Sequence, residues 1–128
     1  MRIKDIMKKA VTVKKDASLK EAVKLMVDKG LGCLIVVDGD KIEGILTERD
    51  ALKQISKDVD NLKKPARDFM TTDIITVDAK NDLEFAADIM TDRKIKKLPV
   101  TENGKLVGII TSTDLIANAD EIDDFSLF

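Results

Sequence analysis

Hydrophobic positions along this chain follow two periods in turn, and the same order occurs twice. Short β-branched stretches at residues 11–13 and 74–77 predict strands. Apolar residues then recur at i, i+3, i+4 and i+7, beginning at Leu19 and again at Leu83, which predicts an amphipathic helix after each strand. Each half of the chain therefore opens with a strand followed by a helix.

A hairpin and a further helix complete each half. Apolar runs flank the turn sequences Asp38-Gly39-Asp40 and Glu102-Asn103-Gly104, and Asp-Gly and Asn-Gly are strong hairpin signals. The predicted strand pairs are residues 33–37 with 42–46 and residues 98–101 with 106–110. A last helix is expected from Asp50 and again from Asp114. Both halves are thus predicted to follow the order β-α-β-β-α.

The two halves match residue by residue in one register. Thr12 aligns with Thr76, and the later matches keep the same offset without a gap. They include Leu19 with Leu83, Ala22 with Ala86, Met26 with Met90, Gly44 with Gly108, Thr47 with Thr111 and Asp50 with Asp114. Further upstream, Ile6-Met7 matches Phe69-Met70 with one residue of slack. A register held across strands, helices and a hairpin indicates an internal repeat.

This repeat predicts an α+β fold of two units, residues 1–60 and residues 61–128, the second with an acidic C-terminal tail. One such unit is too small to bury the face of its own sheet. We therefore expect the two units to pack sheet to sheet with pseudo-twofold symmetry. Duplicated binding residues would then lie in a cleft on the symmetry axis.

Composition excludes several functions. The chain has 128 residues, 44% of them hydrophobic and 36% charged, with a net charge of −2. Without a large basic field, nucleic acid binding is not expected. The absence of His and the single Cys33 argue against a metal site, a Cys–His nucleophile and any enzyme. No apolar run reaches the ~18 residues of a membrane span, so a cytoplasmic, non-membrane protein is expected.

The second half contains Arg67-Asp68-Phe69-Met70, Leu98-Pro99-Val100, and a run from Gly108 through Thr111-Ser112-Thr113-Asp114 to Leu115. This pattern resembles the CBS domain, named after cystathionine β-synthase, and the first half resembles it nearly as well. The resemblance implies a tandem pair that binds AMP, ADP, ATP or S-adenosylmethionine, although some members bind none. It also implies that the Asp of a Thr-x-x-Asp motif holds the ribose hydroxyls. Here these motifs are Thr47-x-x-Asp50 and Thr111-x-x-Asp114.

The Thr-x-x-Asp spacing has a second interpretation. Thr as N-cap and Asp at the third helical position form a capping box, which stabilises a helix without any ligand. The two interpretations are compatible, because a carboxylate near a helix start can also accept hydrogen bonds from a ribose diol. From spacing alone both stay open.

The resemblance also suggests where the rest of a nucleotide would bind. The candidate contacts to adenine are Thr12, Val13, Ile75, Thr76, Leu98 and Pro99, and the candidate cations for phosphate are Arg49, Lys96 and Lys97. The aliphatic residues also suit a plain core, and the cations suit a solvated basic face. Because the first half has Gly32 and Cys33 where the second has lysines, the sites should differ, with the Asp114 site better suited to a nucleotide.

The leading hypothesis is a stand-alone regulatory module that needs no cofactor, binds an adenosine-containing ligand and acts on an unidentified protein. The alternatives are an assembly module with degenerate sites, or a nucleic acid binder that uses residues 93–97. Phe85 and Ile89 form an extra apolar stripe, which predicts a homodimer through these helices. The tail, residues 120–128, is expected either to fray or to dock its Phe residues on a neighbour.

Overall fold

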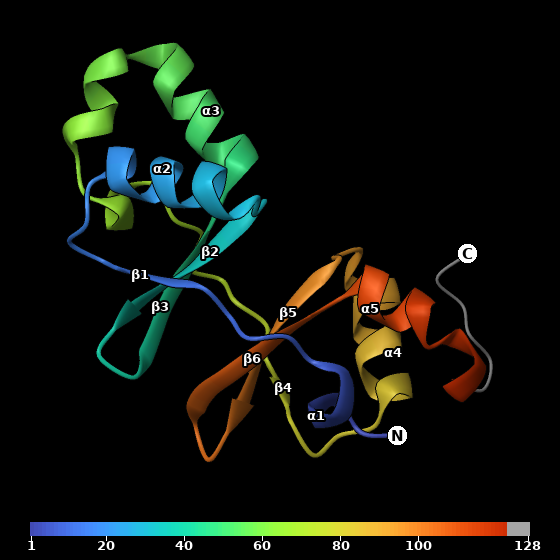
Figure 1. The fold of residues 1–128 in the computed structure, drawn as a ribbon. Helices are drawn as coiled ribbons and strands as arrows, with labels where there is room; N and C mark the ends of the chain where they lie inside the picture. Colours follow the sequence, from blue (N-terminus) through green and yellow to red (C-terminus); the bar gives the residue numbers. More distant parts are fainter. Residues whose placement is uncertain (123–128) are drawn as a thin grey trace. The chain divides into compact units, whose positions relative to one another are not determined.

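The computed structural model describes residues 1–122, so the predicted behaviour of the Phe residues in the tail lies outside the described part. The chain forms two compact units (Figure 1). One, here called the central unit, is Val11–Ile74. The other, here called the split unit, joins Met1–Ala10 to the residues from Ile75 onward. The first ten residues thus belong to the unit of the second repeat, while the boundary between residues 60 and 61 stays a prediction for the sequence repeats.

The central unit contains a three-stranded sheet and two main helices. The order in the sheet is β1-β2-β3, with β1 parallel to β2 and β2 antiparallel to β3. The elements are β1 (Thr12–Lys14), α2 (Leu19–Lys29), β2 (Cys33–Asp38), β3 (Lys41–Thr47), α3 (Glu48–Lys57) and the 3-10 turns η1 (Val59–Lys63) and η2 (Ala66–Asp68).

The split unit repeats this arrangement with the sheet order β4-β5-β6. Its elements are α1 (Ile3–Ile6), β4 (Val77–Asp78), α4 (Leu83–Arg93), β5 (Lys97–Glu102), β6 (Lys105–Thr111), α5 (Ser112–Ala117) and η3 (Ala119–Glu121). The predicted α+β fold with the order β-α-β-β-α is confirmed in both units. The strand expected over residues 74–77 is shorter, because only Val77 and Asp78 pair with β5.

Local chemistry explains where the first long helix of each unit begins and ends. Ser18 Oγ accepts a hydrogen bond from the Glu21 amide at 3.1 Å, and an Asp82 carboxylate oxygen accepts one from the Phe85 amide at 3.0 Å. Such side chains satisfy amides that the first turn leaves free. Helix α2 ends at Gly30 in the left-handed conformation, with φ 63°. Helix α4 ends in the same way at Lys94, with φ 56°, although a side chain makes this conformation costly.

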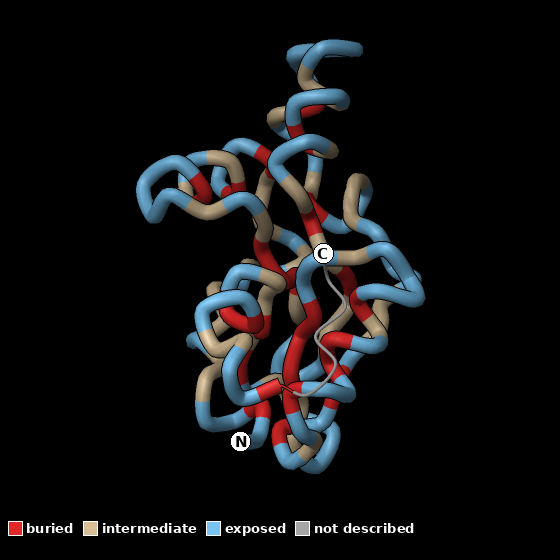
Figure 2. Tube along the Cα trace, turned by 90° about the vertical axis from the view of Figure 1, so that its right-hand side faces the viewer, coloured by how far each residue is buried: buried red, intermediate tan, exposed pale blue. Residues whose placement is uncertain are grey.

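Each unit has its own apolar core. Figure 2 shows the buried positions of the chain in red. The central core consists of Leu19, Ala22, Met26, Leu34, Val36, Leu46, Ala51 and Ala66. The split core consists of Ile3, Val77, Ala79, Leu83, Ala86, Ala87, Met90, Leu98, Val100, Ile110, Leu115 and Ile122. Ile3 is fully buried there, so the start of the chain is part of the core of the split unit.

A short segment pairs with the last strand of each sheet beside a glycine. In the split unit, Lys8 and Ile109 exchange two backbone hydrogen bonds of 2.9 Å, and a Cβ on Gly108 would lie 2.8 Å from the Lys8 carbonyl oxygen. In the central unit, Thr71 and Ile45 exchange bonds of 2.8 and 2.9 Å. There, a Cβ on Gly44 would lie 2.7 Å from the Thr71 carbonyl oxygen. Glycine is therefore required for the close backbone approach, and Lys8 and Thr71 occupy equivalent positions.

Within residues 1–122, every helix falls short of the length and apolar character that crossing a membrane requires. The sheet-to-sheet packing of the two units stays a prediction.

Candidate functional site

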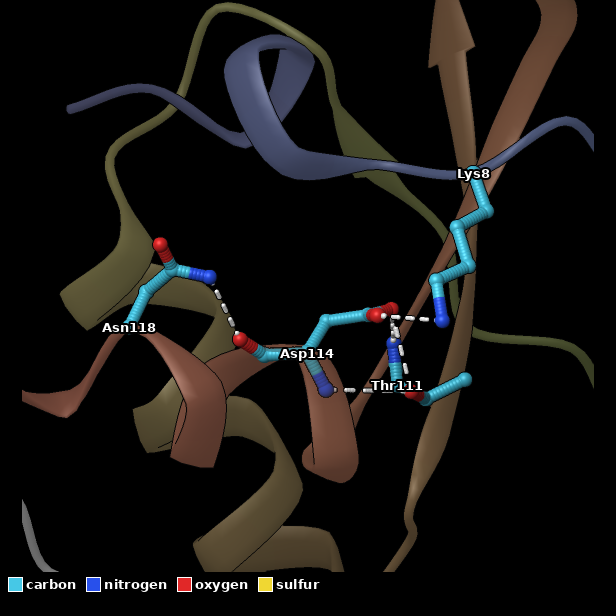
Figure 3. Close-up of polar contacts among 4 residues, drawn as sticks. All are labelled: Lys8, Thr111, Asp114 and Asn118. Atoms are coloured by element: carbon cyan, nitrogen blue, oxygen red, sulfur yellow. Dashed lines mark hydrogen bonds and ion pairs between the residues drawn. The ribbon is translucent and has the colours of Figure 1, made fainter.

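The Asp114 carboxylate is fixed at the start of α5 by the preceding threonine (Figure 3). Asp114 Oδ2 accepts hydrogen bonds from the Thr111 amide at 2.9 Å and from Thr111 Oγ1 at 3.0 Å. Thr111 Oγ1 in turn accepts one from the Asp114 amide at 3.3 Å. This is the capping box that the spacing predicted. Asn118 Nδ2 adds a hydrogen bond of 2.9 Å to the Asp114 carbonyl oxygen, one turn further along.

The other carboxylate oxygen of Asp114 faces a lysine from the start of the chain. Lys8 Nζ lies 3.2 Å from Asp114 Oδ1 (Figure 3). The aspartate is only 5% exposed, whereas the lysine is 70% exposed. Oδ2 thus accepts its hydrogen bonds from Thr111, and Oδ1 forms an ion pair with the exposed ammonium group of Lys8.

The matching carboxylate in the central unit has a different environment. Thr47 caps α3 and accepts a hydrogen bond of 3.1 Å from the Asp50 amide. Asp50 is half-buried, and within residues 1–122 its carboxylate forms neither a hydrogen bond nor an ion pair. The position equivalent to Lys8 is Thr71, which carries no charge. The two motifs therefore share their backbone geometry but differ in the state of the carboxylate.

The predicted cations of the split unit lie directly opposite the motif. Lys97 pairs with Thr111 in the sheet, and the Ser112 amide donates to the Lys96 carbonyl oxygen at 2.8 Å. Both lysines are exposed. In the central unit, Cys33 pairs with Thr47, and Gly32 accepts from the Glu48 amide at 2.9 Å. The structure thus brings Lys96 and Lys97 beside Thr111, and it places uncharged residues at the equivalent positions.

The other predicted contacts are spread over the two sheets. Thr12 is exposed and Val13 half-buried on β1, the strand at the opposite edge of the sheet from β3. Ile75 is half-buried and Thr76 exposed, just before β4. Arg49 is exposed in the first turn of α3. Thr12, Thr76 and Arg49 are thus open to solvent, whereas Val13 and Ile75 pack against the cores of their units. Neither a hydrogen bond nor an ion pair joins the side chains of these five residues to the two carboxylates.

Leu98 and Pro99 are buried in β5, and Leu98 belongs to the core of the split unit. A core role therefore accounts for Leu98 without any ligand. Sequence reasoning missed Lys8 as a site residue. The signal was present, since the match of Ile6-Met7 with Phe69-Met70 places Lys8 opposite Thr71.

Each unit also has a hollow beside its helices. The hollow of the central unit measures about 480 Å³ and is lined by Val23, Met26, Val27, Gly30, Leu31, Gly32, Glu48, Ala51, Leu52 and Ile55. The hollow of the split unit measures about 470 Å³ and is lined by Met90, Thr91, Lys94, Ile95, Lys96, Ser112 and Ile116. The first is lined mainly by aliphatic side chains, of which Val27 is 73% and Leu52 60% exposed.

Among residues 1–122, Lys15 is a titratable group away from the motifs whose surroundings shift its pKa. Lys15 Nζ donates a hydrogen bond of 3.0 Å to Asp38 Oδ2, and this bond together with the negative charge of Asp38 raises the pKa of Lys15. The shift moves the lysine further from titration at neutral pH. It therefore adds no pH dependence to the candidate site.

Both repeats match the family of the CBS domain, over residues 3–57 and 66–121. The chain belongs to the CBS-domain family. The CBS domain-containing protein YhcV of Bacillus subtilis is 32% identical over 118 residues, which cover 91% of this chain and 84% of that relative. A 17.7 kDa protein of Acidianus ambivalens is 37% identical over 110 residues, 84% of this chain.

Several relatives are longer than this CBS pair. The chain spans 65% of the length of the Acidianus protein, and 41% and 36% of two proteins from Methanocaldococcus jannaschii. Among solved structures, the CBS domain pair of protein MJ0100 has a TM-score of 0.82 and 28% identity. The match covers 94% of this chain and 96% of that one. That pair was solved in complex with 5′-methylthioadenosine and S-adenosyl-L-methionine.

Proposed function

We propose that this CBS pair is a regulatory module, not an enzyme, that binds an adenosine-containing ligand at Asp50 and Asp114. The observation that carries the proposal is the pair of matched carboxylates, each in the first turn of a helix that directly follows the last strand of a sheet. The ligand class is AMP, ADP, ATP or S-adenosylmethionine. The bound ligands of the MJ0100 pair, which is similar over nearly its whole length, support an adenosine compound.

The chemistry of the carboxylates suits a ribose. An ionised carboxylate has about four acceptor positions, and a ribose diol offers two donors. The Asp50 carboxylate accepts no hydrogen bond within residues 1–122, so both of its oxygens are available. Asp114 offers Oδ1, which contacts only the exposed Lys8 among the described residues. A ligand can therefore bind each carboxylate without breaking the helix cap.

The remaining contacts follow from the same positions. Exposed Lys96 and Lys97 beside Thr111, and exposed Arg49 beside Asp50, supply cations for a phosphate. The adenine would rest on aliphatic side chains, because the chain has no Tyr or Trp. We assign this contact to Val13 and Ile75, next to the hydroxyls of Thr12 and Thr76, with Leu98 and Pro99 as the buried support.

Calorimetric titration with AMP, ATP and S-adenosylmethionine tests the proposal. Loss of a hydrogen bond to a charged group costs about 1.5–3 kcal/mol, so Asp50→Ala and Asp114→Asn should each weaken their own site about ten- to a hundredfold. Asp28→Ala, which removes an exposed carboxylate on α2, is the matched control and should bind as the unmodified chain does. If none of the three ligands gives a heat of binding at a protein concentration of about 100 μM, the proposed ligand class is excluded.

A second candidate, assembly with another copy of the chain, is favoured by apolar side chains on the helices. Phe85 is 46% exposed and Ile89 half-buried on α4, and Val27 and Leu52 are exposed at the hollow of the central unit. Light scattering should show a homodimer that Phe85→Lys weakens, whereas Lys20→Glu, a charge change at an exposed position in the first turn of α2, should not. A monomer at micromolar concentration would refute this candidate. Assembly and ligand binding are compatible in one regulatory module that acts on another protein.

A further inference from the structure

We propose that Lys8 determines which ligand the Asp114 site takes, an inference that rests on the proposed function. With Lys8 beside its carboxylate, the Asp114 site favours a phosphorylated adenosine ligand. The Asp50 site, which has Thr71 in the equivalent position, favours an adenosine compound without a phosphate.

The first observation is the ion pair itself. Lys8 Nζ lies 3.2 Å from Asp114 Oδ1, so a nearly buried negative charge has a built-in positive partner. The ammonium group has three donors, and only the contact with Asp114 uses any of them among the described residues. Because Lys8 is 70% exposed, its remaining donors face solvent. They are available to an anionic group on a ligand that occupies the same carboxylate.

The second observation is the equivalence of Lys8 and Thr71. Both residues pair through two backbone hydrogen bonds with the last strand of a sheet, at Ile109 and at Ile45. Both lie beside a glycine that the segment approaches closely, and both are exposed. The chain thus presents one site with the lysine and one without it on the same backbone. The contribution of this one side chain can therefore be measured by exchanging Lys8 and Thr71 within each site.

The surrounding charges point the same way. Around the Asp114 motif the charged residues are one carboxylate, Asp114, and three lysines, Lys8, Lys96 and Lys97. Around the Asp50 motif they are two carboxylates, Glu48 and Asp50, and one arginine, Arg49. The net charge is +2 in the first set and −1 in the second, so a phosphate dianion prefers the first set even though Arg49 gives the second one cation. Lys8 is the only one of the three lysines with an ion pair to the motif's carboxylate among residues 1–122.

The size of the effect follows from Coulomb's law. One unit charge 4 Å from another contributes about 1 kcal/mol in water, which corresponds to about a fivefold change in affinity. A phosphate carries nearly two charges, which increases the effect, and screening by salt reduces it. We therefore expect the affinity for a phosphorylated ligand to change about five- to tenfold, and the affinity for adenosine to change less than about twofold.

The experiment compares adenosine and AMP in a chain with one site left. In an Asp50→Ala background, where only the Asp114 site remains, calorimetry at low salt gives the dissociation constants with Lys8 and with Lys8→Thr. Lys8→Thr should weaken AMP about five- to tenfold and leave adenosine nearly unchanged. Lys8→Arg should restore AMP binding, and Lys4→Thr, which removes an exposed lysine of the same segment, should change neither ligand.

The reciprocal substitution, Thr71→Lys, separates a change in ligand preference from a loss of folding. In an Asp114→Asn background, Thr71→Lys should strengthen AMP binding at the Asp50 site about fivefold. If both ligands bind but the ratio of their affinities is the same in all variants, the role of Lys8 is refuted and the proposed function stands. Equal weakening of AMP and adenosine by Lys8→Thr would also refute it, since a structural role affects both. If neither ligand binds the unmodified chain, both the proposed function and this inference fail.

Discussion

At the residue scale, the two Thr-x-x-Asp motifs are helix caps that leave a carboxylate for other contacts. Sequence reasoning predicted the cap, because it depends on residues three positions apart. It could not predict that Asp114 is held by Lys8, since the two residues are at opposite ends of the chain and meet only in the folded split unit. Sequence reasoning also could not predict why glycine is required at positions 44 and 108, because the backbone that approaches each glycine comes from a segment distant in sequence.

The two caps should differ in strength. Thr111→Ala removes a cap and also the Oγ1 hydrogen bond to a carboxylate that is 5% exposed, although the backbone amide of residue 111 still donates to that carboxylate. Thr47→Ala removes only a cap, beside a half-buried carboxylate. Loss of an N-cap costs about 1 kcal/mol, and loss of one hydrogen bond to a charged group adds about 1.5–3 kcal/mol. Urea unfolding should therefore show a larger loss for Thr111→Ala.

Thr113→Ala, at an exposed position in the same first turn, serves as the control and should change the free energy of unfolding by less than about 0.5 kcal/mol. Equal losses for Thr47→Ala and Thr111→Ala would contradict the assigned hydrogen bonds.

At the element scale, the repeated pattern predicted the strands, the hairpins and the helices, because each has a period or turn signal of its own. The exception is the first strand of the second repeat. The β-branched residues Ile74, Ile75 and Thr76 predict strand, yet pairing begins only at Val77. Propensity alone does not make a strand when the neighbouring strand offers no partner, and the partner is set by the tertiary fold.

The ends of α2 and α4 differ in a way that mutation can test. Lys94 adopts the left-handed conformation that Gly30 has in the other repeat. In a residue with a side chain, this conformation raises the free energy of the folded state by about 1 kcal/mol or more. The greater freedom of glycine in the unfolded chain offsets about 0.4–1 kcal/mol of this gain, so Lys94→Gly should stabilise the protein by less than about 1 kcal/mol in urea unfolding.

Gly30→Ala is the matched opposite change and should destabilise the protein, even though a Cβ at Gly30 would meet no atom within 4 Å. A loss of stability in Lys94→Gly would show that the lysine side chain contributes more than the backbone strain costs.

At the scale of the whole molecule, the two compact units do not follow the order of the chain. Met1–Ala10 completes the split unit, and the segment up to Ile74 completes the central unit. Sequence reasoning found the repeat, but it did not predict that the first ten residues join the second repeat. That assignment depends on which core each segment packs into, and only the structure shows this. Ile3 is the anchor, since its side chain is fully buried in the core of the split unit.

Ile3→Ala should therefore act on one unit. Removal of a buried Ile side chain costs about 2–5 kcal/mol, and the cost should appear in the split unit. Hydrogen exchange should show faster exchange in β4, β5 and β6 than in the unmodified chain, with β1, β2 and β3 affected less. Leu34→Ala, at a fully buried position of the central core, should give the reverse pattern. The same increase in both units for both variants would contradict the division into two cores.

The claim that each matched carboxylate holds an adenosine ligand can be tested by counting ligands. Native mass spectrometry with AMP or S-adenosylmethionine, at a concentration just sufficient to fill both sites of the unmodified chain, should show two ligands per chain. It should show one in Asp50→Ala, one in Asp114→Asn, and none in the double variant. Full occupancy in the double variant, with its fold intact by circular dichroism, would show that the ligand binds elsewhere.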